Sequence, residues 1–128
     1  MKFGKLIFLG LLSCVTVGAY AASGTAVTIQ SNNVVLSLGH TSCNYVKYSG
    51  NVLTYTAPTT PCTITLHHGA GSKLVKLLFS FEMLGDNLEL YAAPSKGYTV
   101  NGHAGKLDLT HSGQYCGQNG CTVVFAKS

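Results

Sequence analysis

The chain has 128 residues and few charges: eight lysines, no arginine and four acidic residues, for a formal net charge of +4. The lysines are spread along the chain, whereas a nucleic-acid-binding surface usually has clustered basic residues that include arginine. We therefore expect no nucleic-acid partner and attribute the mild positive charge to solubility. The chain also contains no phosphate-binding glycine loop, and no cofactor is predicted.

The first 21 residues have the three-part pattern of a secretory signal peptide. Two lysines precede an uncharged apolar run, Leu6 to Val17, and Ala19-Tyr20-Ala21 supplies the small residues needed for cleavage after Ala21. The apolar run has about 12 residues and is shorter than the ~20 needed to span a bilayer. The sequence thus predicts an exported bacterial protein, periplasmic or secreted. Its mature chain, residues 22–128, is expected to be one small domain without a transmembrane segment.

Cys14 offers an alternative within this segment. Leu11-Leu12-Ser13-Cys14 is similar to the lipoprotein box of bacteria, in which the cysteine is lipidated and becomes the new N-terminus. The residues that follow Cys14 stay apolar, however, and a good Ala-x-Ala site comes after them. We therefore place cleavage after Ala21 and keep a lipoprotein anchored at Cys14 as the alternative.

The residues from Thr25 onward lack a long helical period. Short runs of β-branched, aromatic and leucine residues alternate with turn residues about every 8 to 12 positions. We expect strands at Thr25 to Gln30, Val34 to Leu38, Tyr45 to Tyr48, Val52 to Thr56, Thr63 to His67, Lys73 to Leu84, Leu88 to Ala92, Tyr98 to Val100, Lys106 to Thr110 and Thr122 to Ala126. The pattern predicts an all-β fold, a small antiparallel β-sandwich or barrel of about eight to ten short strands braced by disulfides.

The stretch from Lys73 to Ala92 is the clearest hairpin. In an extended chain one face of its first strand carries Val75, Leu77, Phe79, Phe81 and Met83. This face is expected to lie in the core. A helix over 73–84 is the alternative, because the leucines there also fit a 3.6-residue period. The Phe-Ser-Phe sequence, the lack of helix caps and the turn that follows favour the strand.

Four cysteines remain after cleavage, and an even number in a small exported chain predicts two disulfides. Three pairings are possible among Cys43, Cys62, Cys116 and Cys121. We favour Cys43–Cys62 with Cys116–Cys121, because each pair lies within one stretch rich in turn residues. By the chain-entropy relation, these bridges contribute about 3 and about 2 kcal/mol.

The histidines are His40, His67, His68, His103 and His111, a prominent set in a chain with so few ionisable residues. A metal site needs two or three imidazoles around one ion. The adjacent His67 and His68 would point to opposite faces of a strand. We therefore predict no metal site and keep a histidine-based metal-binding protein as an alternative.

A cysteine nucleophile is the other chemical alternative. His103, a gap and then Gly120-Cys121 is similar to the motif of the L,D-transpeptidases, which crosslink peptidoglycan. In that family Ser/Thr-His-Gly-Cys is followed by an arginine, whereas here Asn119 replaces the second histidine and arginine is absent. The resemblance would make the protein a periplasmic cell-wall-modifying enzyme with Cys121 as nucleophile. Because a disulfide would remove that thiolate, no catalytic residue is predicted.

Binding to another protein is the leading prediction. Tyr45 and Tyr48 lie near the first disulfide, and tyrosine combines contact area with a hydroxyl group. The other candidate is the loop 113–120, which the Cys116–Cys121 bridge would hold at its end and which contains Gln114, Tyr115, Gln118 and Asn119. Ser112-Gly113-Gln114-Tyr115 is similar to the Ser-Gly-x-x-Tyr loop of small periplasmic lysozyme inhibitors, at a spacing one residue shorter. We expect a non-enzymatic protein of inhibitor, immunity or host-interaction type, with a protein partner in the envelope or on a host.

Overall fold

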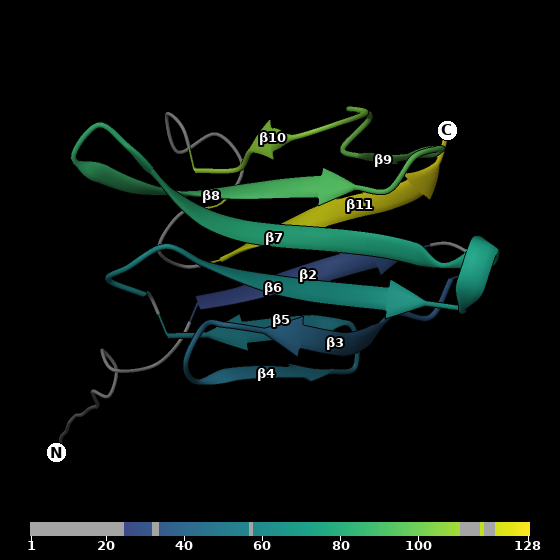
Figure 1. The fold of residues 1–128 in the computed structure, drawn as a ribbon, viewed down its shortest axis with the longest axis horizontal. Helices are drawn as coiled ribbons and strands as arrows, with labels where there is room; N and C mark the ends of the chain where they lie inside the picture. Colours follow the sequence, from purple (N-terminus) through teal and green to yellow (C-terminus); the bar gives the residue numbers. More distant parts are fainter. Residues whose placement is uncertain (1–24, 32–33, 57, 111–115, 117–119) are drawn as a thin grey trace, which may run out of the picture.

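The computed structural model describes residues 25–31, 34–56, 58–110, 116 and 120–128. These residues form ten β-strands and one 3-10 turn, Gly71–Lys73, in two five-stranded sheets (Figure 1). The described residues contain no α-helix, which confirms the all-β prediction. The predicted signal peptide and Cys14 lie outside the described residues.

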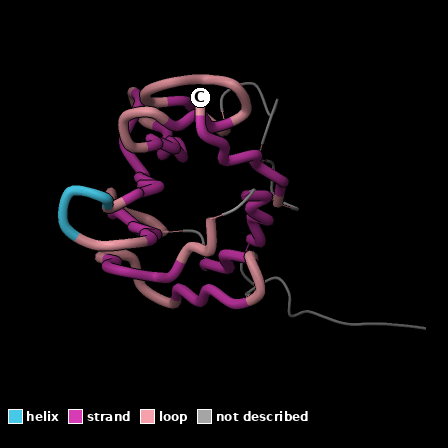
Figure 2. The backbone as a smooth tube through the Cα atoms, turned by 90° about the vertical axis from the view of Figure 1, so that its right-hand side faces the viewer, coloured by secondary structure: helices cyan, strands magenta, loops and turns pink. Residues whose placement is uncertain are grey.

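The first sheet has the spatial order β10 (Leu107–Asp108), β8 (Asn87–Pro94), β7 (Val75–Leu84), β6 (Cys62–His68) and β3 (Ser37–Thr41). The second sheet has the order β4 (Val46–Ser49), β5 (Val52–Tyr55), β2 (Thr25–Ser31), β11 (Cys121–Lys127) and β9 (Tyr98–Val100). Seen end on, the strands surround the space that the core side chains fill (Figure 2). The arrangement is that of a β-sandwich.

The core follows the two-residue period of the strands, because alternate side chains point between the sheets. The largest fully buried side chains are Phe79, Phe125, Ile29, Leu53, Ile64, Leu66, Leu77, Leu90, Leu109, Val27, Val100 and Val123. The segment 75–84 is a strand, so the strand prediction is confirmed over the helix. Its predicted core face is buried at Leu77, Phe79 and Phe81. Met83 is 50% exposed, because it lies beside the turn that connects β7 to β8.

The prediction of a purely antiparallel arrangement is wrong at one pair of strands. β11 runs parallel to β2, with Cys121 opposite Val27 and Phe125 opposite Ser31. All other strand pairs in the two sheets are antiparallel. The first and last described strands are therefore direct neighbours at the middle of the second sheet.

The strand predicted at Val34 to Leu38 is displaced in the structure, where β3 begins only at Ser37. Residues 34–36 form an irregular connection whose carbonyl groups are bound by side chains. The Ser31 hydroxyl donates to the Val34 carbonyl at 2.7 Å, and Nδ1 of His68 lies 2.8 Å from the Val35 carbonyl oxygen. Leu36 is buried in the core and anchors this connection.

Both disulfides have the favoured pairing, Cys43 with Cys62 and Cys116 with Cys121. The first joins Cys43, in the connection between β3 and β4, to Cys62, the first residue of β6, with Cα atoms 5.1 Å apart. The second joins Cys116 to Cys121, the first residue of β11, with Cα atoms 4.6 Å apart. The preferred connectivity from sequence is therefore confirmed.

Tyr55 supplies a test of the core. Its side chain is 4% exposed and packs edge-on against Phe81, with ring centroids 5.1 Å apart. Burial raises the pKa of Tyr55 from 10.0 to about 12. Because the folded state favours the protonated hydroxyl, the resulting stability is fully present below pH 10 and is lost as the pH rises through about 12. We expect urea unfolding to show a loss on the order of 2 kcal/mol over this window. A Tyr55→Phe variant that loses just as much would contradict this origin.

Candidate binding site

A polar cavity of about 210 Å³ lies beside the Cys43–Cys62 bridge. It forms where the connection between β3 and β4 approaches the residues that follow β5. Its lining consists of Ser42, Cys43, Asn44, Tyr45, Thr56, Pro58, Thr59, Thr60 and Cys62. The cavity therefore combines two segments that the disulfide holds together.

The β3–β4 connection is fixed to β6 by more than the disulfide. The Thr41 hydroxyl accepts a hydrogen bond from the Cys43 amide at 3.0 Å and donates to the Thr63 carbonyl at 3.1 Å. The Ser42 amide donates to the Thr63 carbonyl at 2.9 Å, and the Ser42 hydroxyl accepts from the Thr63 amide at 2.9 Å. Cys43 and Cys62 are both buried. This wall of the cavity is therefore ordered before any ligand arrives.

Tyr45 combines an unusual backbone with an exposed ring. Its φ of 57° lies in the left-handed region, which costs an L-residue roughly 1–2 kcal/mol. Its carbonyl accepts a hydrogen bond from the Thr56 amide at 3.4 Å. The residue is 83% exposed, so burial of the ring does not offset this cost. Strained residues of this kind are concentrated at functional sites.

The other lining groups are uncharged and available for hydrogen bonds. Asn44, Thr56, Thr59 and Thr60 are exposed, and their side chains form no hydrogen bond with another described residue. Hydroxyl and amide groups both donate and accept. No lysine, histidine or acidic residue is among the lining residues that the structure describes. The described lining thus offers uncharged donors and acceptors, which suit a neutral polar group.

Tyr48 does not share this cavity. It is half-buried and lines a separate groove, of about 360 Å³, with Val35 to Leu38 and Ser49 to Asn51. Its hydroxyl is buried and has no hydrogen-bond partner among the described residues. Burial also raises the pKa of Tyr48 above 10.0. The structure therefore separates the two tyrosines that the sequence placed together.

The second predicted site can be located only through its ends. Gln114, Tyr115, Gln118 and Asn119 lie outside the described residues. Cys116 is buried, and its amide donates to the Leu109 carbonyl at 2.7 Å. Cys121 is bonded to Cys116, and a disulfide sulfur is not a thiolate nucleophile.

The histidines are dispersed over the structure. His40, His68 and His103 are exposed and His67 is half-buried, while His111 lies outside the described residues. No group of three or more histidine, cysteine or acidic side chains suited to a metal ion occurs in the part of the chain that the structure describes.

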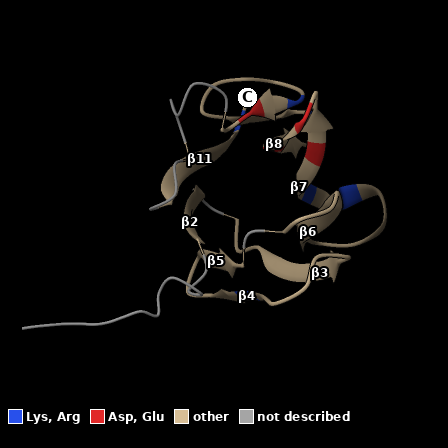
Figure 3. Cartoon of the chain, turned by 90° about the vertical axis from the view of Figure 1, so that its left-hand side faces the viewer, with Lys and Arg blue, Asp and Glu red and all other residues tan. Residues whose placement is uncertain are grey.

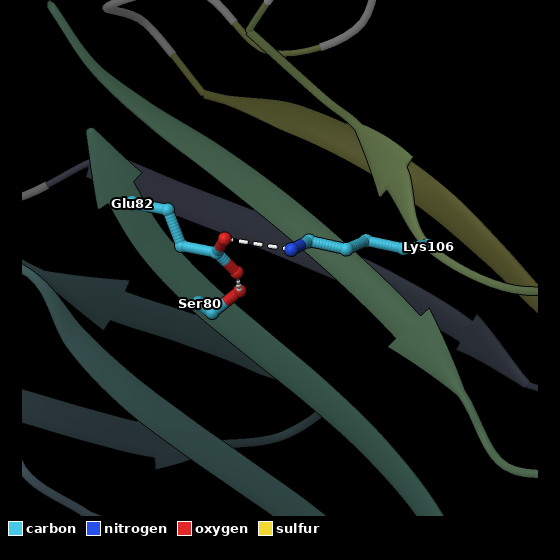
Figure 4. A network of polar contacts seen from close by, with 3 residues as sticks. All are labelled: Ser80, Glu82 and Lys106. Atoms are coloured by element: carbon cyan, nitrogen blue, oxygen red, sulfur yellow. Dashed lines mark hydrogen bonds and ion pairs between the residues drawn. The ribbon is translucent and has the colours of Figure 1, made fainter. Parts of the chain in front are cut away.

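All four acidic residues of the chain lie on or beside β7, β8 and β10 (Figure 3). Glu82 accepts hydrogen bonds from the Ser80 hydroxyl and from Nζ of Lys106, both at 2.6 Å (Figure 4). The same ammonium lies 4.7 Å from the centroid of the Tyr91 ring. These contacts join β7 and β8 to the segment before β10, so this network has a structural role.

The Glu82–Lys106 pair gives a second test. The hydrogen bonds from Lys106 and then Ser80 lower the pKa of Glu82 below 4.5. The stabilisation is therefore present at neutral pH and is lost as the pH falls through the pKa of Glu82. Both side chains are exposed, so Lys106→Met should cost at most about 1 kcal/mol. Carbon-13 NMR titration should show the Glu82 pKa rising towards 4.5 in this variant, and an unchanged pKa would exclude Lys106 as the main cause.

Comparison with protein-family models, curated proteins and solved structures gave no match. Function must therefore be inferred from the residues of this chain.

Among the described residues, no helix has the length and apolar character needed to cross a membrane.

Proposed function

We propose that this chain is an exported, non-enzymatic binding protein that recognises a protein partner in the bacterial envelope or on a host through the Tyr45 cavity. The observation that supports this most strongly is Tyr45 itself, which lines a polar cavity, has an exposed side chain and keeps its backbone in the left-handed conformation. Tyrosine is enriched among residues that dominate binding energies at interfaces. Export is supported by the two disulfides, because such bridges persist in oxidising compartments.

The rigidity of the cavity wall also favours binding. Ordering a loop on association weakens affinity, and a loop that is already ordered avoids this cost. The residues from Thr41 to Tyr45 are held by the disulfide and by bonds to Thr63 and Thr56. Together with the uncharged lining, this arrangement suits recognition better than acid–base or metal chemistry.

Affinity capture tests the proposal. The mature, oxidised chain would be immobilised and exposed to solubilised envelope and host-cell extracts, and retained proteins would be identified by mass spectrometry. Tyr45→Ala should then weaken binding of the purified partner at least about tenfold, as expected for a central tyrosine. Tyr91→Ala on the other sheet is the matched control and should leave the affinity unchanged. Equal affinities of the wild type and Tyr45→Ala would place the site elsewhere.

A further inference from the structure

We infer that the cavity beside the Cys43–Cys62 bridge receives one uncharged sugar ring, carried by the partner as part of a glycan. This inference rests on the proposed function, and it specifies the chemical group that the Tyr45 site recognises. The supporting features are the size of the cavity, the lack of charged residues in its described lining and the presence of the exposed Tyr45 among its lining residues.

The volume limits the ligand to one small group. Sites for drug-sized ligands have volumes of roughly 300–1,000 Å³, whereas this cavity has about 210 Å³. The cavity can hold a single ring or side chain but not a longer molecule. The rest of the ligand must therefore lie outside the cavity.

The lining excludes two kinds of group. A carboxylate or an ammonium would lose hydration without gaining a charged partner, because the described lining has no charge. A purely apolar side chain would displace water from Asn44, Thr59 and Thr60 without replacing their hydrogen bonds. The cavity therefore favours a neutral group with several donors and acceptors.

A sugar ring matches both the hydrogen-bonding groups and the apolar surfaces of the site. Its hydroxyl groups both donate and accept, and so match the hydroxyl and amide groups of Asn44, Thr56, Thr59 and Thr60. Its carbon-bound hydrogens form an apolar face that can pack on the Tyr45 ring. The half-buried Pro58 adds a second apolar surface to the lining. A neutral peptide side chain provides fewer hydroxyl groups for the same volume.

The test is an NMR titration of the nitrogen-15-labelled mature chain with methyl glycosides of glucose, galactose, mannose, fucose, N-acetylglucosamine and N-acetylgalactosamine. We expect at least one to bind with a millimolar dissociation constant and to shift the amides of Asn44, Tyr45, Thr59 and Thr60. Sialic acid and glucosamine serve as charged comparators and should not shift them. Tyr45→Ala should weaken sugar binding at least about fivefold, while Tyr45→Phe keeps the ring and should change it less than about twofold.

Two results would overturn the sugar inference and leave the proposed function intact. In the first, none of the glycosides shifts these amides. In the second, the captured partner keeps its full, Tyr45-dependent affinity after enzymatic removal of its glycans, which would show that the site recognises the protein part of the partner. If Tyr45→Ala affects neither the partner nor the sugars, the proposed site itself fails.

Discussion

Replacing Cys43 and Cys62 together by alanine is expected to lower the free energy of unfolding by about 3 kcal/mol. The bridge joins residues 19 positions apart, and its loss allows the unfolded chain many more conformations. The same change removes the main covalent anchor of the Tyr45 cavity. Partner affinity should therefore fall along with stability, because the residues from Ser42 to Tyr45 must then be ordered on binding. Guanidinium unfolding and binding measurements on the folded variant report the two effects separately.

The second disulfide provides the matched control. Replacing Cys116 and Cys121 by alanine opens a loop whose ends are only five positions apart, and should cost about 2 kcal/mol. Affinity should remain at the wild-type value if Tyr45 forms the site. A loss of affinity confined to the Cys116→Ala, Cys121→Ala variant would instead assign binding to the loop 113–120, with Gln114, Tyr115, Gln118 and Asn119.

Gly120→Ala is expected to lower the free energy of unfolding by about 3 kcal/mol, because two penalties combine. The φ of Gly120 is 94°, a conformation that is unfavourable for alanine. In addition, an added Cβ would collide with the backbone carbonyl oxygen of Ala26, at the point where β11 begins to pair with β2. Relief of this collision requires the two parallel strands to move apart.

Gly97→Ala separates the two penalties. Gly97 has a nearly equal φ of 89°, but nothing lies within 4 Å of the position that its Cβ would occupy. This variant should therefore show only the conformational cost, roughly 1–2 kcal/mol. Thermal or denaturant unfolding of both variants measures the difference. Equal losses of unfolding free energy would mean that the backbone at Ala26 moves away from the added Cβ at no cost in stability.

Strand positions could be predicted from the sequence where turn residues delimit the runs. The strand at Tyr98 to Val100 has the predicted bounds, because Gly97 and Gly102 bracket it in left-handed conformations. The disulfide pairing also followed from local spacing. Pairing direction did not, because a two-residue period shows which side chains share a face and not which strand lies alongside. The parallel contact of β2 with β11 joins opposite ends of the chain, and no local pattern reports it.

The candidate site was only partly predictable. The sequence predicted Tyr45 as a binding residue, and the structure places it at the cavity, but Tyr48, which was predicted with it, lies at a different groove. It did not identify Asn44, Thr56, Thr59 and Thr60 as lining residues. Threonine and asparagine are common in turns and strands, and their shared cavity arises only when the disulfide brings 42–45 and 56–60 together.

The contact between the first and last described strands also constrains how the chain folds. Hairpins such as β4–β5 and β7–β8 join neighbouring segments, and such local pairs form within microseconds. β2, in contrast, has no partner on one edge until β11 is available (Figure 1). While the chain is being synthesised, that edge stays open until residues 121–127 emerge, so the pairing of β2 with β11 forms later than the local hairpins. We therefore expect refolding on the millisecond-to-second scale of proteins dominated by distant contacts.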